Sequence, residues 1–321
     1  DGIRDLSLSL VGSEMCIRDR RNAFDHMIDN LRAARDIIDS PDHFAPPATS
    51  RVLAEGYRYL AGYLHHGVER AFHEDPDFPA FRNALSIFNK ATIDNADAIY
   101  FYAPIDGRNH YRITANIADS RHWRGEARLQ AQAVAPQYLI FETSDGGITG
   151  DSGELTELIP GTRTGFGTLD SSTIVPGPDG EFELILGPDR PAGYDGYFIC
   201  TEKPPREDAS DSENRYATYV SGRQLFYDWE FEEPIALTIT PLGGKGLHPQ
   251  PLTPARAADQ LQRMGNIIHG QMKFWLQFYD VVLNCHGTHE NVNNSPYFMP
   301  VNAYNTPNAA SSDTGGGMST N

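Results

Sequence analysis

Three stretches of the chain place apolar residues at helical spacing. In residues 22–39, apolar side chains recur at positions i, i+3, i+4 and i+7 with charged residues opposite, which predicts an amphipathic helix. Residues 49–72 repeat this pattern. A third helical pattern covers residues 254–283, with Gly265 and Gly270 as positions where it can divide into two helices.

The segment between the second and third helical patterns is patterned for β-strands. Residues 98–105 are apolar on both faces, as in a buried central strand, whereas residues 111–117 alternate apolar and polar side chains. Glycine- and proline-rich turns separate further predicted strands at 138–144, 155–159, 172–176, 181–187, 197–201, 216–227 and 235–240. Many short strands without helices between them predict an antiparallel β-sandwich of the jelly-roll kind.

The sequence therefore predicts an α+β protein whose parts follow one another along the chain. We expect a helical N-terminal region at 21–92, a β-sandwich domain at 93–242 and a helical linker at 253–285. Residues 286–321 are polar and rich in turn residues and contain no closing element, so we expect them to be the truncated start of a second β domain.

Residues 1–20 fit none of these patterns. Their apolar residues alternate with serines and are followed by Glu14, which is unlike a secretory signal. The segment resembles the translation of a sequencing adapter, so we expect it to stay outside the core and the natural start to be missing. Its removal takes away four acidic and three basic residues and changes the net charge of −17 by only one unit.

This acidity excludes some classes of partner. A strongly negative chain repels phosphate backbones and anionic lipid, so we expect neither a nucleic-acid nor a membrane partner. Apart from Cys16 in the segment 1–20, the chain has Cys200 and Cys285, which constitute neither a CxxC pair nor a disulfide framework. The compartment stays open, with the cytoplasm slightly favoured, and no cofactor or oligomeric state is indicated.

Two short motifs have catalytic or metal-binding counterparts elsewhere. Gly150-Asp-Ser-Gly153 is similar to the nucleophile loop of trypsin-like proteases, but the histidine context such enzymes need is absent, and we interpret it as a turn. His286, His289 and Glu290 are zinc-type ligands in a glycine-containing loop. We interpret them as a polar connection, with a metal site as the alternative.

The candidate site residues lie where predicted strands begin and end. Asn95 and Asp97 precede an apolar strand, where their side chains either cap a turn or bind a ligand. In the functional interpretation, Asp97 and Asp228 are catalytic carboxylates. Asn95, Tyr100, Tyr102 and Tyr227 then bind the ligand.

The same stretches carry a resemblance to a known family. Asp94–Asp106 and Gln224–Pro234, with the motif at Asp179-Gly180, resemble bacterial proteins that contain the domain of unknown function numbered 1214, often paired with a relative numbered 1254. The resemblance covers roughly residues 90 to 285, although Ala98 replaces the usual threonine. It implies jelly-roll domains joined by helices, and a missing C-terminal domain as a partner in the same chain, but no settled activity.

Two functions are compatible with these features. The first is handling of a small molecule or carbohydrate in a pocket of the β-sandwich, with or without catalysis. The alternative is a non-catalytic binding or assembly module. The 16 phenylalanines and 15 tyrosines suit a ligand pocket and a sandwich core equally well.

Overall fold

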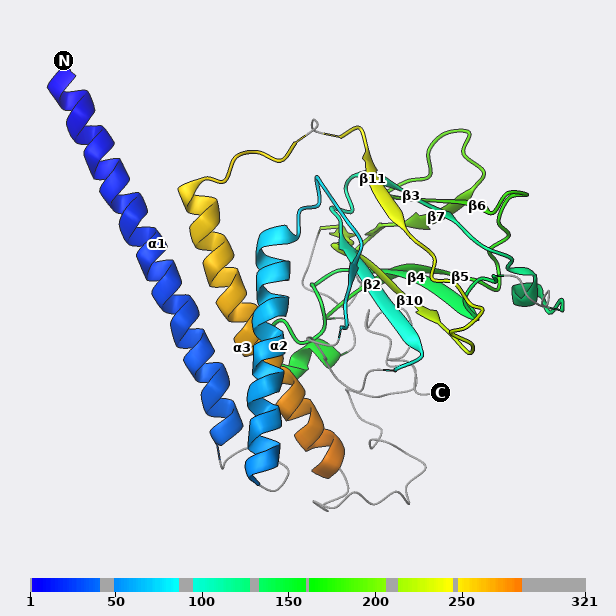
Figure 1. Ribbon diagram of the computed structural model, residues 1–321. Helices are drawn as coiled ribbons and strands as arrows, with labels where there is room; N and C mark the ends of the chain where they lie inside the picture. The colour runs from blue at the N-terminus through cyan, green and yellow to red at the C-terminus, as the bar shows by residue number, and fades with distance from the viewer. Residues whose placement is uncertain are drawn as a thin grey trace. The chain divides into compact units, whose positions relative to one another are not determined.

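The computed structural model describes residues 2–40, 49–86, 95–127, 133–159, 162–205, 213–244 and 248–284, with the side chains of residues 2–18 and 279–284 outside the description. The chain forms two compact units (Figure 1). A helical unit takes its described residues from 1–73, 150–155 and 250–298. The two-sheet unit contains the strands, so the α+β fold class is confirmed.

The helical unit consists of α1 (Gly2–Asp39), α2 (Ser50–His73) and α3 (Pro254–Asn284), together with the loop 150–155. Both α1 and α2 pack against α3, which contributes buried apolar side chains such as Ile268 and Phe274. The hydroxyl of Thr253 accepts a hydrogen bond from the Arg256 amide at 3.2 Å. This side-chain cap explains where α3 begins.

The glycines of α3 do not divide it, contrary to one sequence expectation. A Cβ at Gly265 would lie 2.8 Å from the Cα of Met27, and one at Gly270 would lie 2.4 Å from the carbonyl oxygen of Asp151. Both glycines therefore permit close approach, of α1 at one position and of the loop 150–155 at the other.

The first helix begins earlier in the chain than the sequence pattern predicted. It is continuous from Gly2 to Asp39, whereas the sequence pattern indicated a helix from residue 22. The expectation that residues 1–20 stay outside the core concerns mostly side chains that lie outside the description.

The two-sheet unit contains a five-stranded sheet of order β1-β2-β10-β4-β5 and a four-stranded sheet of order β11-β3-β6-β7. The first sheet comprises β1 (Arg82–Asn83), β2 (Ala98–Pro104), β10 (Tyr219–Leu225), β4 (Tyr138–Ser144) and β5 (Gly165–Asp170). The second comprises β11 (Thr238–Leu242), β3 (His110–Asn116), β6 (Glu181–Gly187) and β7 (Tyr197–Cys200). A separate hairpin pairs β8 (Glu202–Lys203) with β9 (Arg215–Tyr216).

The two sheets share one hydrophobic core. Phe141 of β4 stacks on Phe182 of β6, with ring centroids 5.7 Å apart and planes inclined by 11°. Buried side chains from the inner faces of both sheets surround this pair, among them Phe101, Tyr111, Leu139, Leu184 and Val220. Stacked aromatic rings bury large apolar areas, so this pair ties one sheet to the other.

Most predicted strands are present, and three expectations were wrong. Residues 155–159 contain the 3₁₀ helix η2 (Leu155–Leu158) instead of a strand. Residues 172–176 form a turn and an irregular segment instead of a strand, and the strand β5 that precedes them was not predicted. The sandwich was expected to be antiparallel, and among its strand pairs β6 and β7 depart from this because they pair in parallel.

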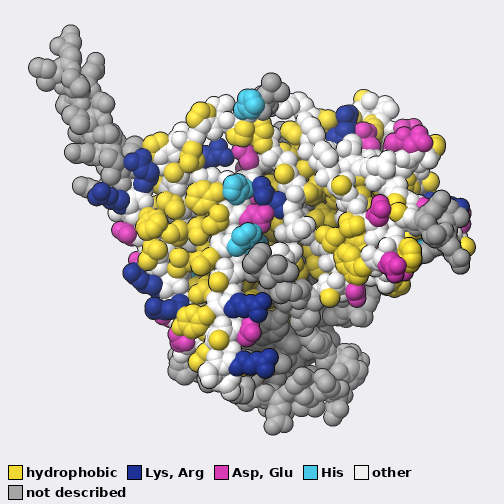
Figure 2. Space-filling view, viewed as in Figure 1, with side chains coloured by type: hydrophobic (Ala, Val, Ile, Leu, Met, Phe, Trp, Pro, Cys, Tyr) yellow, Lys and Arg dark blue, Asp and Glu magenta, His cyan; other side chains and the backbone are white. Residues whose placement is uncertain are grey.

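The surface of the helical unit carries several large apolar side chains. Tyr57, Leu64 and Val68 of α2 are exposed, and hydrophobic side chains spread over this unit on the face drawn in Figure 2. Within the described residues, no helix combines the length and the apolar character that crossing a bilayer requires.

Candidate functional site

Strand pairing brings two of the predicted site segments together. The strands β2 and β10 run antiparallel, and Ala98 lies opposite Leu225. Next to this pair, the amide of Phe226 donates a hydrogen bond to the carbonyl oxygen of Asp97 at 2.8 Å. The turn at Asn95–Asp97 and the loop after β10 therefore lie at the same end of the five-stranded sheet.

The predicted polar residues at this sheet end take part in turns. The Oδ1 atom of Asn95 accepts a hydrogen bond from the Asp97 amide at 2.9 Å, and Oδ1 of Asp228 accepts one from the Glu230 amide at 3.0 Å. Such bonds are what Asx residues make when they cap turns. They support the turn interpretation for Asn95 and show that Asp228 also caps a turn, whereas the Asp97 carboxylate stays exposed.

The segment 226–233, which we call the aromatic loop, exposes three large rings. Tyr227 is 75% exposed, Trp229 49% and Phe231 44%. Acidic residues separate these rings in the sequence: Asp228, Glu230 and, beyond Phe231, Glu232 and Glu233. Large aromatic side chains are normally buried, so three exposed rings within five residues form an unusual surface feature.

The aromatic loop is held in place by buried contacts. Trp229 lies flat on the fully buried Phe226, with ring centroids 4.0 Å apart and planes inclined by 16°. The carboxylate of Glu232, only 3% exposed, accepts a hydrogen bond from the Tyr227 amide at 2.9 Å. One face of the Trp229 ring is thus covered by Phe226, and the half-exposed indole forms a fixed platform.

Backbone hydrogen bonds fix the loop to its surroundings. The amides of Phe231 and Glu232 both donate to the carbonyl oxygen of Asp228, at 3.3 and 2.9 Å. Val134 donates to the Phe231 carbonyl oxygen at 3.0 Å and accepts a bond from the Glu233 amide at 2.8 Å. Because the backbone is bonded on both sides, binding to the rings carries little further cost for ordering the loop backbone.

Tyr100 and Tyr102 lie elsewhere, on the face of the five-stranded sheet turned away from the core. Their neighbour Phe101 points into the core, and side chains alternate along a strand. Tyr102 is 1% exposed, and Tyr100 is half-buried opposite Arg223. These tyrosines therefore lie within the strand β2, whereas Tyr227, with which they were grouped, lies in the loop beyond the end of β10.

The alternative metal site falls on residues that the structure does not describe. His286, His289 and Glu290 all lie outside the described ranges. Among the residues that are described, no three histidine, cysteine or acidic side chains are gathered in a way that would hold a metal ion.

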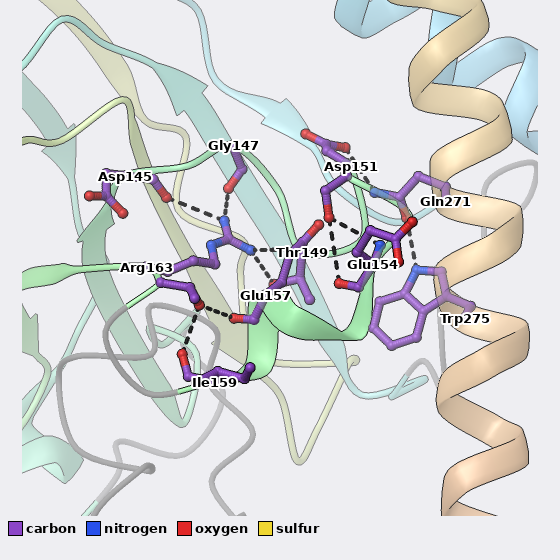
Figure 3. A network of polar contacts seen from close by, with 12 residues as sticks. Asp145, Gly147, Thr149, Asp151, Glu154, Glu157, Ile159, Arg163, Gln271 and Trp275 are labelled. Carbon is purple, nitrogen blue, oxygen red and sulfur yellow. Dashed lines mark hydrogen bonds and ion pairs between the residues drawn. The ribbon is translucent and has the colours of Figure 1, made fainter. Parts of the chain in front are cut away.

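The Gly150-Asp-Ser-Gly153 motif forms a structural anchor in the helical unit. Asp151 accepts a hydrogen bond from Nε2 of Gln271 at 2.9 Å, and Oε1 of Gln271 accepts one from the Trp275 indole at 2.8 Å (Figure 3). The other main partner of Asp151 is Arg70, whose Nη atoms lie 2.6 and 2.8 Å from the two carboxylate oxygens. These contacts support the turn interpretation of the motif.

The charges around Asp151 explain its ionisation. Burial raises the pKa of Asp151, but the charge of Arg70 and the hydrogen bonds from Arg70 and Gln271 lower it more, so the pKa lies below its usual range. In His66, burial first and then the positive charge of Arg70 lower the pKa to about 3. The anchor thus combines an ionised carboxylate with a neutral imidazole at neutral pH.

A second polar network belongs to the two-sheet unit. Arg163, 4% exposed, donates to the carbonyl oxygen of Gly147 and, at 2.9 Å, to the hydroxyl of Thr149 (Figure 3). Its guanidinium also lies 3.3 Å from a carboxylate oxygen of Glu157. Because these contacts join neighbouring loop segments, we assign Arg163 to the stability of the loop segments that contain Gly147, Thr149 and Glu157.

Sequence reasoning missed Trp229 and Phe231 as site residues. The alternation of aromatic and acidic residues from Phe226 to Glu232 was the available signal. In a buried strand with period two, acids at alternate positions face solvent and the rings face the core. The same alternation in a loop leaves the rings exposed, and the sequence does not show where β10 ends.

The geometry of the aromatic loop suits recognition of a polyhydroxylated ring. One face of a pyranose presents C–H groups, which pack on the electron-rich face of an aromatic ring. Carboxylates are acceptors only, and hydroxyl groups are the donors that match them. An uncharged ligand also avoids repulsion from the acidic chain.

Comparisons with known proteins bear on the fold. No model of a protein family matches the chain, and a search of curated proteins finds no match. Among solved structures, the chain is similar to an uncharacterised protein from Burkholderia cenocepacia, with 23% sequence identity and a TM-score of 0.59. The similarity covers 78% of this chain but only 58% of that one. At this identity it shows that the two chains share a fold.

Proposed function

We propose that this protein binds a carbohydrate, with Trp229 of the aromatic loop as the platform on which a sugar ring stacks. The observation that carries the proposal is the fixed, half-exposed Trp229 ring, covered by Phe226 on one face and flanked in sequence by acidic residues. Tyr227 and Phe231 extend the apolar surface, and carboxylates such as Asp228 and Glu230 supply hydrogen-bond acceptors.

The resemblance to proteins with the domain of unknown function numbered 1214 is part of the same proposal. The two sheets around one core agree with the jelly-roll domains that this resemblance implies, although the parallel pair of β6 and β7 departs from a wholly antiparallel arrangement. A catalytic role for Asp97 and Asp228 stays a prediction. It requires that Asp97→Asn abolish turnover of the bound sugar without lowering the melting temperature.

A glycan array tests the proposal directly. The labelled full chain is applied to an array of neutral and charged oligosaccharides, beside the variants Trp229→Ala and Tyr227→Ala. We expect reproducible binding to neutral glycans that is lost with Trp229→Ala. Val175, which is 58% exposed but lies outside the aromatic loop, supplies the matched control Val175→Ala, and its binding should equal that of the wild type.

The same rings favour a second function, because tryptophan and tyrosine also dominate protein interfaces. In that case the protein is an assembly module whose aromatic loop packs against another protein surface. The absence of glycan binding, together with a change in oligomeric mass for Trp229→Ala in light scattering, would favour assembly and overturn the carbohydrate proposal.

A further inference from the structure

Four polar side chains from three adjacent strands gather on the outer face of the five-stranded sheet, turned away from the core. Arg223 of β10 lies opposite Tyr100 of β2 on one side and Ile140 of β4 on the other. Tyr138 and Glu142 lie two residues to either side of Ile140 on β4, which makes them the diagonal neighbours of Arg223. Long side chains at diagonal positions are within reach of one another.

These four side chains have hydrogen-bonding capacity that no group in the described part of the chain uses. Within the described residues, the side chains of Tyr100, Tyr138, Glu142 and Arg223 make no hydrogen bond or ion pair. All four are half-buried. Their polar atoms are therefore open to a ligand, and an arginine offers five N–H donors in a fixed fork. The cluster is therefore poised to bind a ligand that supplies acceptors to Arg223.

The electrostatics of the cluster support this view. Burial raises the pKa of Glu142, and the nearby charges of Arg223 and Arg163 only partly offset that effect. Burial also raises the pKa of Tyr138, with Asp170 as the next cause. A carboxyl group that is desolvated but not paired with the arginine beside it leaves that arginine available to another anion.

We propose that this cluster binds a small monocarboxylate with an apolar body, whose carboxylate occupies the fork of Arg223. Arginine recognises carboxylates through two parallel N–H···O bonds. Ile140 and the rings of Tyr100 and Tyr138 offer apolar surface to the rest of the ligand, and their phenol groups offer donors. A phosphate dianion is disfavoured because it places two negative charges beside Glu142.

This site is separate from the proposed carbohydrate platform. The platform follows the end of β10 and uses Trp229, whereas the carboxylate cluster uses the strand interior around Arg223. Failure of one proposal therefore leaves the other standing. The single variants Tyr227→Ala and Trp229→Ala should each weaken or remove glycan binding and leave carboxylate binding intact.

The test uses benzoate as the monocarboxylate probe and inorganic phosphate as the comparison. Binding to the full chain is followed at pH 7 by ligand-observed NMR and isothermal titration. We expect saturable benzoate binding, tighter than that of phosphate, which Arg223→Met weakens at least tenfold. Glu142→Gln should tighten it, because the substitution removes the negative charge next to the bound carboxylate.

Arg112→Met is the matched control, because Arg112 is an exposed arginine on β3 that is ion-paired with Glu183 at 3.0 Å. It should bind benzoate like the wild type, and circular dichroism verifies that each variant is folded. Absence of saturable benzoate binding, phosphate binding tighter than benzoate, or a folded Arg223→Met variant with unchanged affinity would each overturn the proposal.

Discussion

The guanidinium of Arg70 and the carboxylate of Asp151 form a bidentate ion pair in the helical unit, with N–O distances of 2.6 and 2.8 Å. The Arg70 side chain is fully buried, and the Asp151 carboxylate that balances its charge also accepts a hydrogen bond from Gln271. The pair joins α2 to the loop 150–155, which is 81 residues further along the chain.

Removing the charge of Asp151 should destabilise the protein strongly. We expect Asp151→Asn to lower the free energy of unfolding by about 3–5 kcal/mol, because the buried Arg70 guanidinium loses the carboxylate that accepts two of its hydrogen bonds. Urea denaturation of the wild type and of Asp151→Asn measures this difference in the free energy of unfolding. The exposed pair Arg58–Glu55 provides the comparison, and Glu55→Gln should cost less than about 1 kcal/mol. Equal, small losses for both variants would contradict the assignment of Asp151 as an anchor.

His66 makes stability depend on pH. Burial and the charge of Arg70 lower its pKa to about 3, whereas the unfolded chain takes up this proton near pH 6.5. Between these values the unfolded state holds more protons, so the free energy of unfolding falls as the pH decreases. At pH 5 the loss relative to pH 7 is about 2 kcal/mol.

His66→Gln should flatten this dependence between pH 7 and pH 5, as measured by urea denaturation at several pH values. The exposed neighbour His65 serves as the control, and His65→Gln should keep the slope of the wild type. Identical slopes for His66→Gln and the wild type would show that His66 is accessible to protons in the folded state.

Gly270 should not tolerate alanine, although alanine is the better helix former. A Cβ there would lie 2.4 Å from the carbonyl oxygen of Asp151, and backbone atoms cannot move aside easily. We expect Gly270→Ala to lower the free energy of unfolding by about 1–3 kcal/mol. A stability gain, as intrinsic helix propensity predicts, would show that the loop 150–155 is not held against α3.

The sequence predicted the bounds of a strand best where turn residues flank its apolar segment. The strands at 138–144 and 181–187 have the predicted boundaries because their apolar residues end at clear turn sequences. Residues 155–159 have apolar residues at strand-like spacing, yet they form a 3₁₀ turn, because a short apolar segment does not specify its backbone. The strand β5 was missed because Gly165 and Gly167 weaken its strand signal.

The site was less predictable than the fold, because it depends on pairings between distant residues. The turn bond of Asn95 follows from local sequence, but the approach of Phe226 to Asp97 depends on the pairing of β2 with β10. The same pairing sets Tyr100 opposite Arg223. The periodicity of a strand does not show which residues of another strand lie opposite it. For this reason Arg223 and Glu142 were not among the expected site residues.

Glu232 should control the order of the aromatic loop. Its buried carboxylate accepts a hydrogen bond from the Tyr227 amide. Glu232→Ala removes this acceptor and therefore loosens the loop. We expect faster amide hydrogen exchange in residues 226–231 and weaker glycan binding. Glu233 is adjacent but exposed, and Glu233→Ala should leave exchange in the loop unchanged. Equal exchange rates in the two variants would argue against a preorganised loop.

The measurement that tests the central claim most directly is a calorimetric titration of the wild type and of Trp229→Ala with a neutral oligosaccharide selected on the array. Trp229 is half-exposed, so its truncation should change the melting temperature little while it removes the stacking surface. We predict at least a tenfold weaker affinity for Trp229→Ala and an unchanged affinity for Val175→Ala. Equal affinities of the wild type and a folded Trp229→Ala variant would contradict the account.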